Sequence, residues 1–424
     1  MLQVLGTSWA LLLGMGLLQV GNGLQGTLLG IRGGLEGFST FEMSVVMSAY
    51  FLGFLGGSRL TPELIRRVGH VRVFAALASF ISAVLILYPA IPDPSAWTIG
   101  RVIIGFCFSG VYVTAESWLN NAATNDNRGK ALSVYMVVQM SGIVAAQFLL
   151  TTGADPAGFL LFVIPSVLVS ISFAPILLSI SPTPAFDTAK PMTLRELVSA
   201  SPLGCVGMFL LGGVFAAQFG MAAVYGTERG LSVSEISIFV ASFYVGAVLL
   251  QFPIGWVSDR MDRRLLILLA AFAGGVGATM GFILDAQFEF LLLSAFLVGG
   301  LSNPLYALLI AYTNDFLEHE DMAAASGGLI FINGIGAIAG PLVVGWMMGV
   351  FGPEGFFLFI ALLMGGLGSY ACVRMLIRPS TTSVEDTTSY APLTATASPV
   401  AVEVAQEVYI ETELEETSET NAAI

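Results

Sequence analysis

Twelve apolar runs of about twenty residues, separated by short breaks, constrain this chain more than any other feature. The hydrocarbon core of a bilayer needs about 20 apolar residues per helix. Only 11% of the 424 residues are charged, whereas soluble domains carry roughly 25%, so water cannot be the main solvent. We predict an all-α membrane protein whose transmembrane helices lie near 5–29, 43–60, 71–89, 97–119, 130–153, 158–180, 202–226, 235–257, 265–285, 289–313, 324–350 and 353–377.

The longest polar stretch before the C-terminal tail divides these runs into two sets of six. It covers 181–201, and its prolines prevent either flanking helix from continuing through it. The predicted fold is therefore twelve transmembrane helices in two pseudo-symmetric six-helix halves, 1–180 and 202–378, joined by a cytoplasmic linker. Two similar halves around one longer loop is a plan typical of secondary transporters.

The remaining segment, 379–424, is acidic. The net charge of −13 is concentrated here, because nine of the 29 acidic residues lie in the last forty positions and no basic residue follows Arg378. Such a composition cannot bury enough apolar surface to fold alone, so we expect a solvated, disordered tail. A docking or regulatory segment is the alternative.

Lysine and arginine residues predict the orientation. If the first loop lies outside, 13 of the 16 basic residues fall on the inner side, as the positive-inside rule requires. We expect a multi-pass protein of the cytoplasmic (inner) membrane with both termini, the linker and the tail in the cytoplasm.

The loop between runs eight and nine reads "GWVSDRMDRR", and the corresponding loop of the first half reads "PELIRRVGHVR". An offset of 193 residues superposes Arg67 of the first loop on Arg260 of the second. One well-formed and one degraded copy at corresponding positions indicate an internal repeat. The better copy resembles the G-x3-D-R-x-G-R-R signature of the major facilitator superfamily, with Asp262 in place of the last glycine.

Two further segments support this resemblance, which covers residues 1–378: "RVIIGFCFSG" in run four and "GAIAGPLVVG" in run eleven. The pair "AESWLNNAATNDNRGKALSVYM" and "NPLYALLIAY" is most similar to a poorly characterised bacterial subgroup. Run five, "QMSGIVAAQFLL", lacks the G-P-x2-G-G ending of drug–proton antiporters. The resemblance implies that charges in these loops latch the cytoplasmic side shut, although they could instead only set the topology. Our gating or coupling candidates are Glu116, Arg128, Gly255, Asp259, Arg260, Arg263, Arg264 and Arg67.

Arg101 stands inside run four and shares one helix face with Gly105, Ser109, Tyr112 and Glu116. A guanidinium at membrane depth must face protein or water, so it either contacts a substrate or coupling group or bonds a neighbouring helix. Glu116 lies about 22 Å further along the helix axis, too far to pair with Arg101. Glu116 either carries a proton during transport or pairs with Arg128 or other loop arginines.

Neutral polar side chains occur in several other runs. Hydrogen bonding between helices explains any one of them, but together they predict a weakly charged chamber. The candidates for its lining are Gln19, Asn22, Gln25, Arg101, Tyr112, Gln218, Tyr225, Gln251, Asn303, Tyr306 and Asn333.

These features predict a secondary active transporter that moves a small solute by alternating access, with proton coupling left open. The alternative is a transporter-like membrane sensor or scaffold that signals through the acidic tail. An enzyme would need paired catalytic groups, and the loops offer no such set, metal site or cofactor motif. We expect the bilayer, a small-molecule substrate and possibly coupled protons as partners, no nucleic acid, and a monomer. Arg101 favours an anionic or zwitterionic substrate.

Overall fold

The computed structural model describes residues 2–122, 125–153, 155–177, 192–284, 287–317, 319–377, 393, 397–398 and 400–402. Eleven helices of the described chain are long and apolar enough to cross a membrane, and α1 is a further helix of 34 residues. The first half comprises α1 (Leu2–Leu35), α2 (Thr40–Val68), α3 (His70–Ala90), α4 (Pro94–Ala122), α5 (Asn125–Leu150), α6 (Leu160–Ser172) and α7 (Ala174–Leu177).

The second half begins with a span built from three pieces and continues with five long helices. Its elements are α9 (Pro202–Ala216), the π-helical turn η1 (Ala217–Met221), α10 (Ala222–Glu228), α11 (Val233–Ser258), α12 (Arg263–Ile283), α13 (Phe288–Asn314), α14 (His319–Phe351) and α15 (Gly355–Ile377). Large apolar side chains such as Val276 and Phe148 are about two-thirds exposed, as expected where lipid is the solvent.

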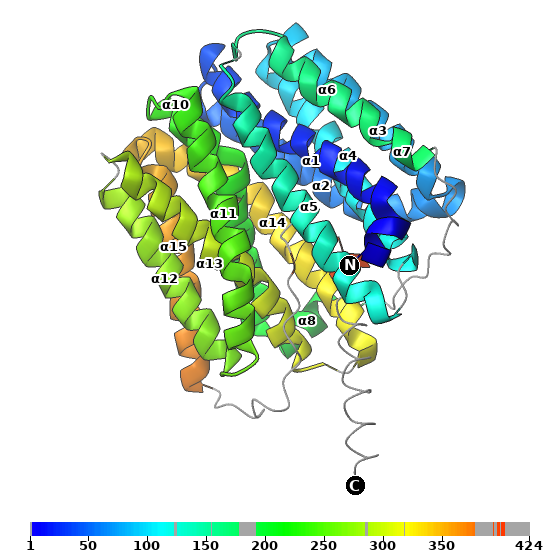
Figure 1. The fold of residues 1–424 in the computed structure, drawn as a ribbon. Helices are drawn as coiled ribbons and strands as arrows, with labels where there is room; N and C mark the ends of the chain where they lie inside the picture. The colour runs from blue at the N-terminus through cyan, green and yellow to red at the C-terminus, as the bar shows by residue number, and fades with distance from the viewer. Residues whose placement is uncertain are drawn as a thin grey trace.

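Corresponding helices pack in the same way in the two halves, which confirms the predicted pseudo-symmetry. In the first half α1 packs on α5, α2 on α4 and α3 on α6; in the second half α9 packs on α14, α11 on α13 and α12 on α15. Figure 1 shows the halves next to each other, with α14 near their junction. Contacts of α11 with α5 and of α14 with α2 join them.

Glycines allow a close helix crossing at corresponding positions of the two halves. A Cβ on Gly53 of α2 would collide with the backbone carbonyl of Val102 on α4, and one on Gly246 of α11 with that of Phe296 on α13. Gly53 and Gly246 differ by the 193 residues that also relate the two basic loops. Small residues let helix backbones approach closely in a membrane, where lipid provides no hydrophobic driving force for helix association. The α2–α4 and α11–α13 crossings are therefore built in the same way, and we call each of them a glycine joint.

The basic residues lie closer to the helices than the sequence predicted. Arg66 and Arg67 occupy the last turn of α2, which continues through Pro62, and Gly255 lies within α11. The second basic turn therefore shrinks to the four residues between Ser258 and Arg263. The end of the bundle at which α2 and α11 end is called the basic face. The end at which α1 ends is called the opposite face.

The predicted linker contains a short helix, α8 (Leu194–Ala200). Its first turn is closed by a capping box in which Thr193 and Glu196 bond each other's backbone N–H groups. Leu197 of α8 is buried against Gly328 of α14. The part of the linker from 181 to 191 lies outside the described residues.

The two halves meet tightly at the opposite face. Thr40 donates a hydrogen bond to the carboxylate of Glu228 at 2.8 Å, and Ser48 donates one to the carbonyl of Ile338 at 2.6 Å. Gly30 of α1 packs against Ala223 of α10 so closely that an added Cβ would clash. These contacts close the bundle on this face.

Candidate functional site

A cavity lies where the two halves meet, with about 1180 Å³ of empty space including the part open to solvent. Both halves contribute to its wall, through helices α1, α2, α4, α5, α9, α11, α13 and α14 and the turn η1. Its polar or aromatic lining residues are Asn22, Gln25, Thr27, Tyr50, Phe51, Phe54, Ser58, Arg101, Gln147, Phe215, Phe219, Tyr244, Asn303 and Asn333. A mostly apolar and aromatic lining with a few polar side chains is typical of small-molecule binding sites.

A chain of hydrogen bonds runs along the first-half wall of the cavity. Arg101 donates to Gln25 at 3.0 Å, and Gln25 donates to Asn22 at 3.2 Å. Asn22 in turn donates to the phenolic oxygen of Tyr112 at 3.1 Å and to Gln19 at 3.3 Å. The structure thus brings together five of the predicted cavity residues, of which Gln19 and Tyr112 lie behind the lining and hold the front ones in place.

Arg101 has no carboxylate partner among the described residues. Its side chain is only 3% exposed, its Cζ lies 4.6 Å from the centre of the Tyr50 ring, and one Nη contacts the sulfur of Met47 at 3.5 Å. Among the described residues its Nε–H has no hydrogen-bond partner. A buried charge held only by an amide, a ring and a thioether retains capacity to bind an anion.

Aromatic rings form the second-half wall. Phe219 stacks on Tyr244 with centroids 5.3 Å apart and on Phe215 at 5.7 Å. Phe219 belongs to η1, and such π-helical turns often occur at functional sites because they reorient side chains. The sequence analysis missed this wall, since aromatic residues in an apolar span carry no signal about which face they occupy.

Of the other six predicted cavity residues, two belong to the lining of the cavity and four do not. Gln218 donates to Ser302 at 2.9 Å, and Tyr225 stacks on Phe356 at 4.9 Å inside the second half. Tyr306 is buried against Phe215. Of the remaining three, Asn303 and Asn333 line the cavity and donate to backbone carbonyls, whereas Gln251 lines a smaller neighbouring cavity.

Glu116 is buried near the basic face and does not line the main cavity. Tyr135 of α5 donates to its carboxylate at 3.2 Å, and the backbone N–H of Ser398 in the C-terminal tail donates to the other oxygen at 2.9 Å. No arginine pairs with Glu116 within the described residues, and the side chain of Arg128 lies outside them. The predicted pairing of Glu116 with a described loop arginine is therefore absent.

The gating candidates around α11 and α12 form ion pairs inside the second half. Arg263 binds both carboxylate oxygens of Asp315, at 2.6 and 2.8 Å, and both side chains are buried. Asp262 caps α12 by accepting the N–H of Arg264 at 2.9 Å and also binds its guanidinium. Although partial burial would raise the pKa of Asp262, these bonds lower it overall. An N-cap aspartate explains why Asp262 can replace the glycine of the signature.

The remaining basic candidates are exposed. Arg260 lies over the ring of Trp256 and donates to its carbonyl, while Arg67 pairs with Glu63 one turn earlier at 2.7 Å. Asp259 forms the exposed C-cap of α11. The sequence analysis missed Asp315, which could have been found as an acidic residue ending the predicted span ten at the same face as Arg263.

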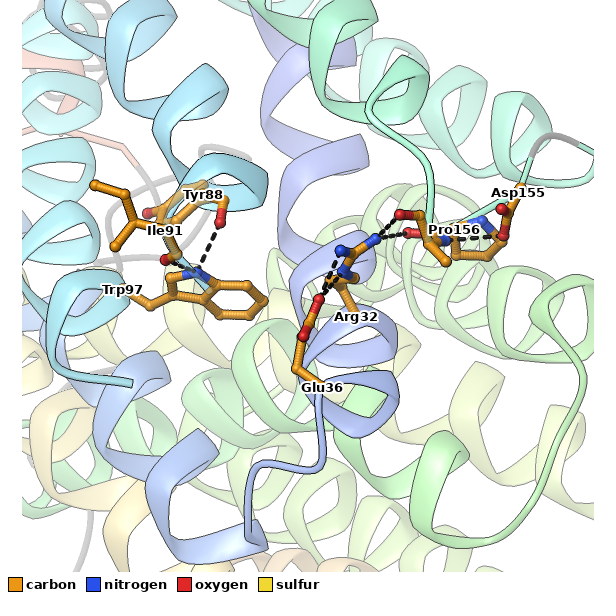
Figure 2. Close-up of polar contacts among 8 residues, drawn as sticks. Arg32, Glu36, Tyr88, Ile91, Trp97, Asp155 and Pro156 are labelled. Atoms are coloured by element: carbon orange, nitrogen blue, oxygen red, sulfur yellow. Dashed lines mark hydrogen bonds and ion pairs between the residues drawn. The ribbon is translucent and has the colours of Figure 1, made fainter. Parts of the chain in front are cut away.

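Arg32 organises the opposite face of the first half (Figure 2). It pairs with Glu36 at 2.6 Å and donates to the carbonyls of Pro156 and Ala157 in the loop before α6. In the same view Trp97 donates to the carbonyls of Tyr88 and Ile91, which fixes the start of α4 against the end of α3. Arg101, one turn further along α4, thereby acquires a rigid support.

Twelve helices in two repeats around a shared central cavity define a polytopic membrane carrier. Comparison with known proteins agrees. A family model described as Major Facilitator Superfamily matches residues 203–405, and one described as Sugar (and other) transporter matches residues 18–187. The chain belongs to the major facilitator superfamily and is a membrane transporter rather than an enzyme.

Individual relatives agree with this assignment over most of the chain. A protein of Escherichia coli O6:K15:H31 (strain 536), described as the uncharacterized MFS-type transporter YcaD, is 28% identical over 377 residues, covering 87% of this chain and 94% of the relative. The solved nucleoside transporter NupG superposes with a TM-score of 0.77 at 14% identity, over 87% of this chain and 99% of that chain. A bacterial homologue of the human lysosomal transporter Spinster gives 0.65 at 15% identity, over 96% and 98% of the two chains.

Proposed function

We propose that this protein is a secondary active transporter of the bacterial inner membrane that moves a small solute by alternating access. The observation that carries the proposal is the cavity between two pseudo-symmetric halves with Arg101 in its wall. Rocking of such halves around a central site exposes the site to each side in turn. The contacts between Thr40 and Glu228 and between Gly30 and Ala223 would break when the opposite face opens.

The substrate carries an anionic group and a flat apolar body. Arg101 provides a fork of N–H donors without a carboxylate partner among the described residues, which suits a carboxylate or phosphate. Across the cavity, Phe219 and Tyr244 provide ring faces that suit a planar or apolar group. The solved relatives described as a nucleoside transporter and a fucose:proton symporter support a small organic solute and make proton coupling worth testing.

The test begins with the solute. Cells lacking or overproducing the protein are compared for small anionic metabolites, and candidates are then assayed for binding to purified protein. Replacing Arg101 by Ala should weaken binding roughly 100-fold, because an uncompensated anion would remain in a largely apolar cavity. Arg101→Lys should weaken it about tenfold, since the charge stays but the fork is lost.

Arg59→Ala is the matched control, because Arg59 is an exposed arginine that packs on Phe331 and does not line the cavity. Its affinity should equal that of the unaltered protein. Unchanged affinity in a folded Arg101→Ala variant would return Arg101 to a helix-packing role. Binding confined to neutral solutes would refute the proposed substrate class.

A further inference from the structure

Part of the acidic C-terminal tail is buried inside the helical bundle. Leu393, Ala397, Ser398, Ala401 and Val402 are no more than 5% exposed, and the four apolar ones belong to the same core as the membrane helices. Composition predicted a solvated tail, but these residues are placed in protein. Apart from these residues and Val400, the chain beyond 377 lies outside the described residues.

The buried residues contact both halves of the transporter. The carbonyl of Leu393 accepts a hydrogen bond from Gln251 of α11 at 3.4 Å, whereas the N–H of Ser398 donates to Glu116 of α4 at 2.9 Å. α4 belongs to the first half and α11 to the second, and both residues lie toward the basic face. The described tail residues therefore contact both halves at their junction on that face.

The sequence of this segment suits burial. Residues 387–402 carry no charge, although Asp386 precedes them and Glu403 follows. The acidic residues of the tail thus flank an uncharged stretch that ends in Pro-Val-Ala-Val. Burying a charge without a partner costs desolvation free energy. The uncharged stretch can therefore enter the bundle, whereas burial of the flanking acidic residues would be unfavourable.

Glu116 gives the docked segment a specific anchor. A buried carboxylate needs hydrogen-bond donors. Within the described residues the donors to Glu116 are the Tyr135 hydroxyl, the backbone N–H and hydroxyl of Ser398, and the backbone N–H of Ala401. The amide of Gln251 likewise bonds the Leu393 backbone. Contacts to the backbone together with small apolar side chains form a peptide-binding site.

We propose that the region between α4 and α11 toward the basic face, around Glu116 and Gln251, is a binding site for the part of the protein's own tail that contains Leu393, Ser398 and Val402. The docked segment ties α4 to α11 and occupies the route from the cavity to the basic face. Rocking of the halves then requires its release. The docking itself does not depend on the proposed function, whereas its effect on transport does.

Disulfide cross-linking in native membranes tests the docking. In a background where Cys107, Cys205 and Cys372 are replaced by Ser, the pair Leu393→Cys and Gln251→Cys should cross-link under mild oxidation. The control pair, Ser418→Cys with Gln251→Cys, should cross-link at least tenfold less. Equal cross-linking of the two pairs would overturn the proposal.

A second change tests the anchor. Ser398→Pro removes the N–H that Glu116 accepts and should lower the cross-linking rate of the 393–251 pair roughly tenfold. Ser418→Pro introduces the same residue elsewhere in the tail and should leave the rate unchanged. Equal rates in the two proline variants would show that Ser398 is not the anchor.

Transport is the third readout, once a solute is known. The cross-linked 393–251 protein should lose at least ten-fold in transport rate, and a reducing agent should restore it. Full transport by the cross-linked protein would remove the inhibitory role while leaving the docking site in place. Absence of transport in every form, including the reduced protein, would instead count against the proposed function.

Discussion

At the scale of single residues, the structure separates buried charges that hold the fold from those available for function. Arg263 is satisfied by the two oxygens of Asp315, both in the second half. Arg101 is buried to a similar degree, but among the described residues its partners are Gln25, Met47 and the Tyr50 ring, without a carboxylate. A buried arginine therefore stabilises the packing at position 263 and offers a binding group at position 101.

Asp315→Asn should destabilise the protein, because it leaves the buried guanidinium of Arg263 without its counter-charge. Breaking a buried ion pair costs about 3–5 kcal/mol, which thermal unfolding of the purified protein in detergent would detect. Asp259→Asn is the matched change at an exposed helix cap. It should leave the unfolding temperature unaltered and reduce transport, as the resemblance to gating loops implies. Equal thermal stability of the two variants would contradict the structural role of Asp315.

Sequence predicted the polar part of the cavity better than its aromatic part. Polar residues in an apolar run are rare enough to be noticed, so Arg101, Gln25 and Asn22 could be found directly. Phe219 and Tyr244 could not, because an aromatic side chain suits lipid, protein core and cavity equally well. Tyr225, selected for its hydroxyl, packs among rings instead.

At the scale of elements, the spans were predictable because lipid demands a fixed length of apolar helix. Helix ends were not, because α2 continues through Pro62 to Val68 and carries its arginines within the helix. The π-helical turn η1 (Ala217–Met221) was not predicted either, because the apolar run from 202 to 226 continues through it without a break. The helix α8 was not predicted, although Thr193 and Glu196 have the spacing of a capping box, which indicates the start of a helix.

At the glycine joint between α2 and α4, adding a single methyl group should destabilise the fold. Gly53→Ala should lower the free energy of unfolding by about 1–3 kcal/mol, because the new Cβ meets the rigid carbonyl of Val102. Gly366→Ala on α15 is the control, since no atom lies within 4 Å of its added Cβ. It should be neutral or slightly stabilising, as alanine favours helices. Thermal unfolding compares the two, and a neutral Gly53→Ala would show that the joint can yield.

At the scale of the whole molecule, the basic residues make a prediction about orientation. Reporters fused after Lys190 or at the C-terminus should be active in the cytoplasm, and a reporter inserted near Gly230 should be active outside. The physical reason is the excess of lysine and arginine in the loops on one side. Alkaline phosphatase and fluorescent protein fusions give complementary readouts. Finding the linker and the C-terminus on different sides would contradict the twelve-helix topology.

The permanent charge of Arg101 has a consequence for how the membrane potential acts on the empty carrier. One elementary charge moved through the full potential changes in energy by about 2.3 kcal/mol per 100 mV. In the proposed alternating-access cycle, Arg101 would lie close to the negative cytoplasmic potential when the cavity opens inward and close to the external potential when it opens outward. An inside-negative voltage would then favour the inward-open state of the empty carrier. A bound anion of the proposed substrate class would cancel the charge and remove this bias.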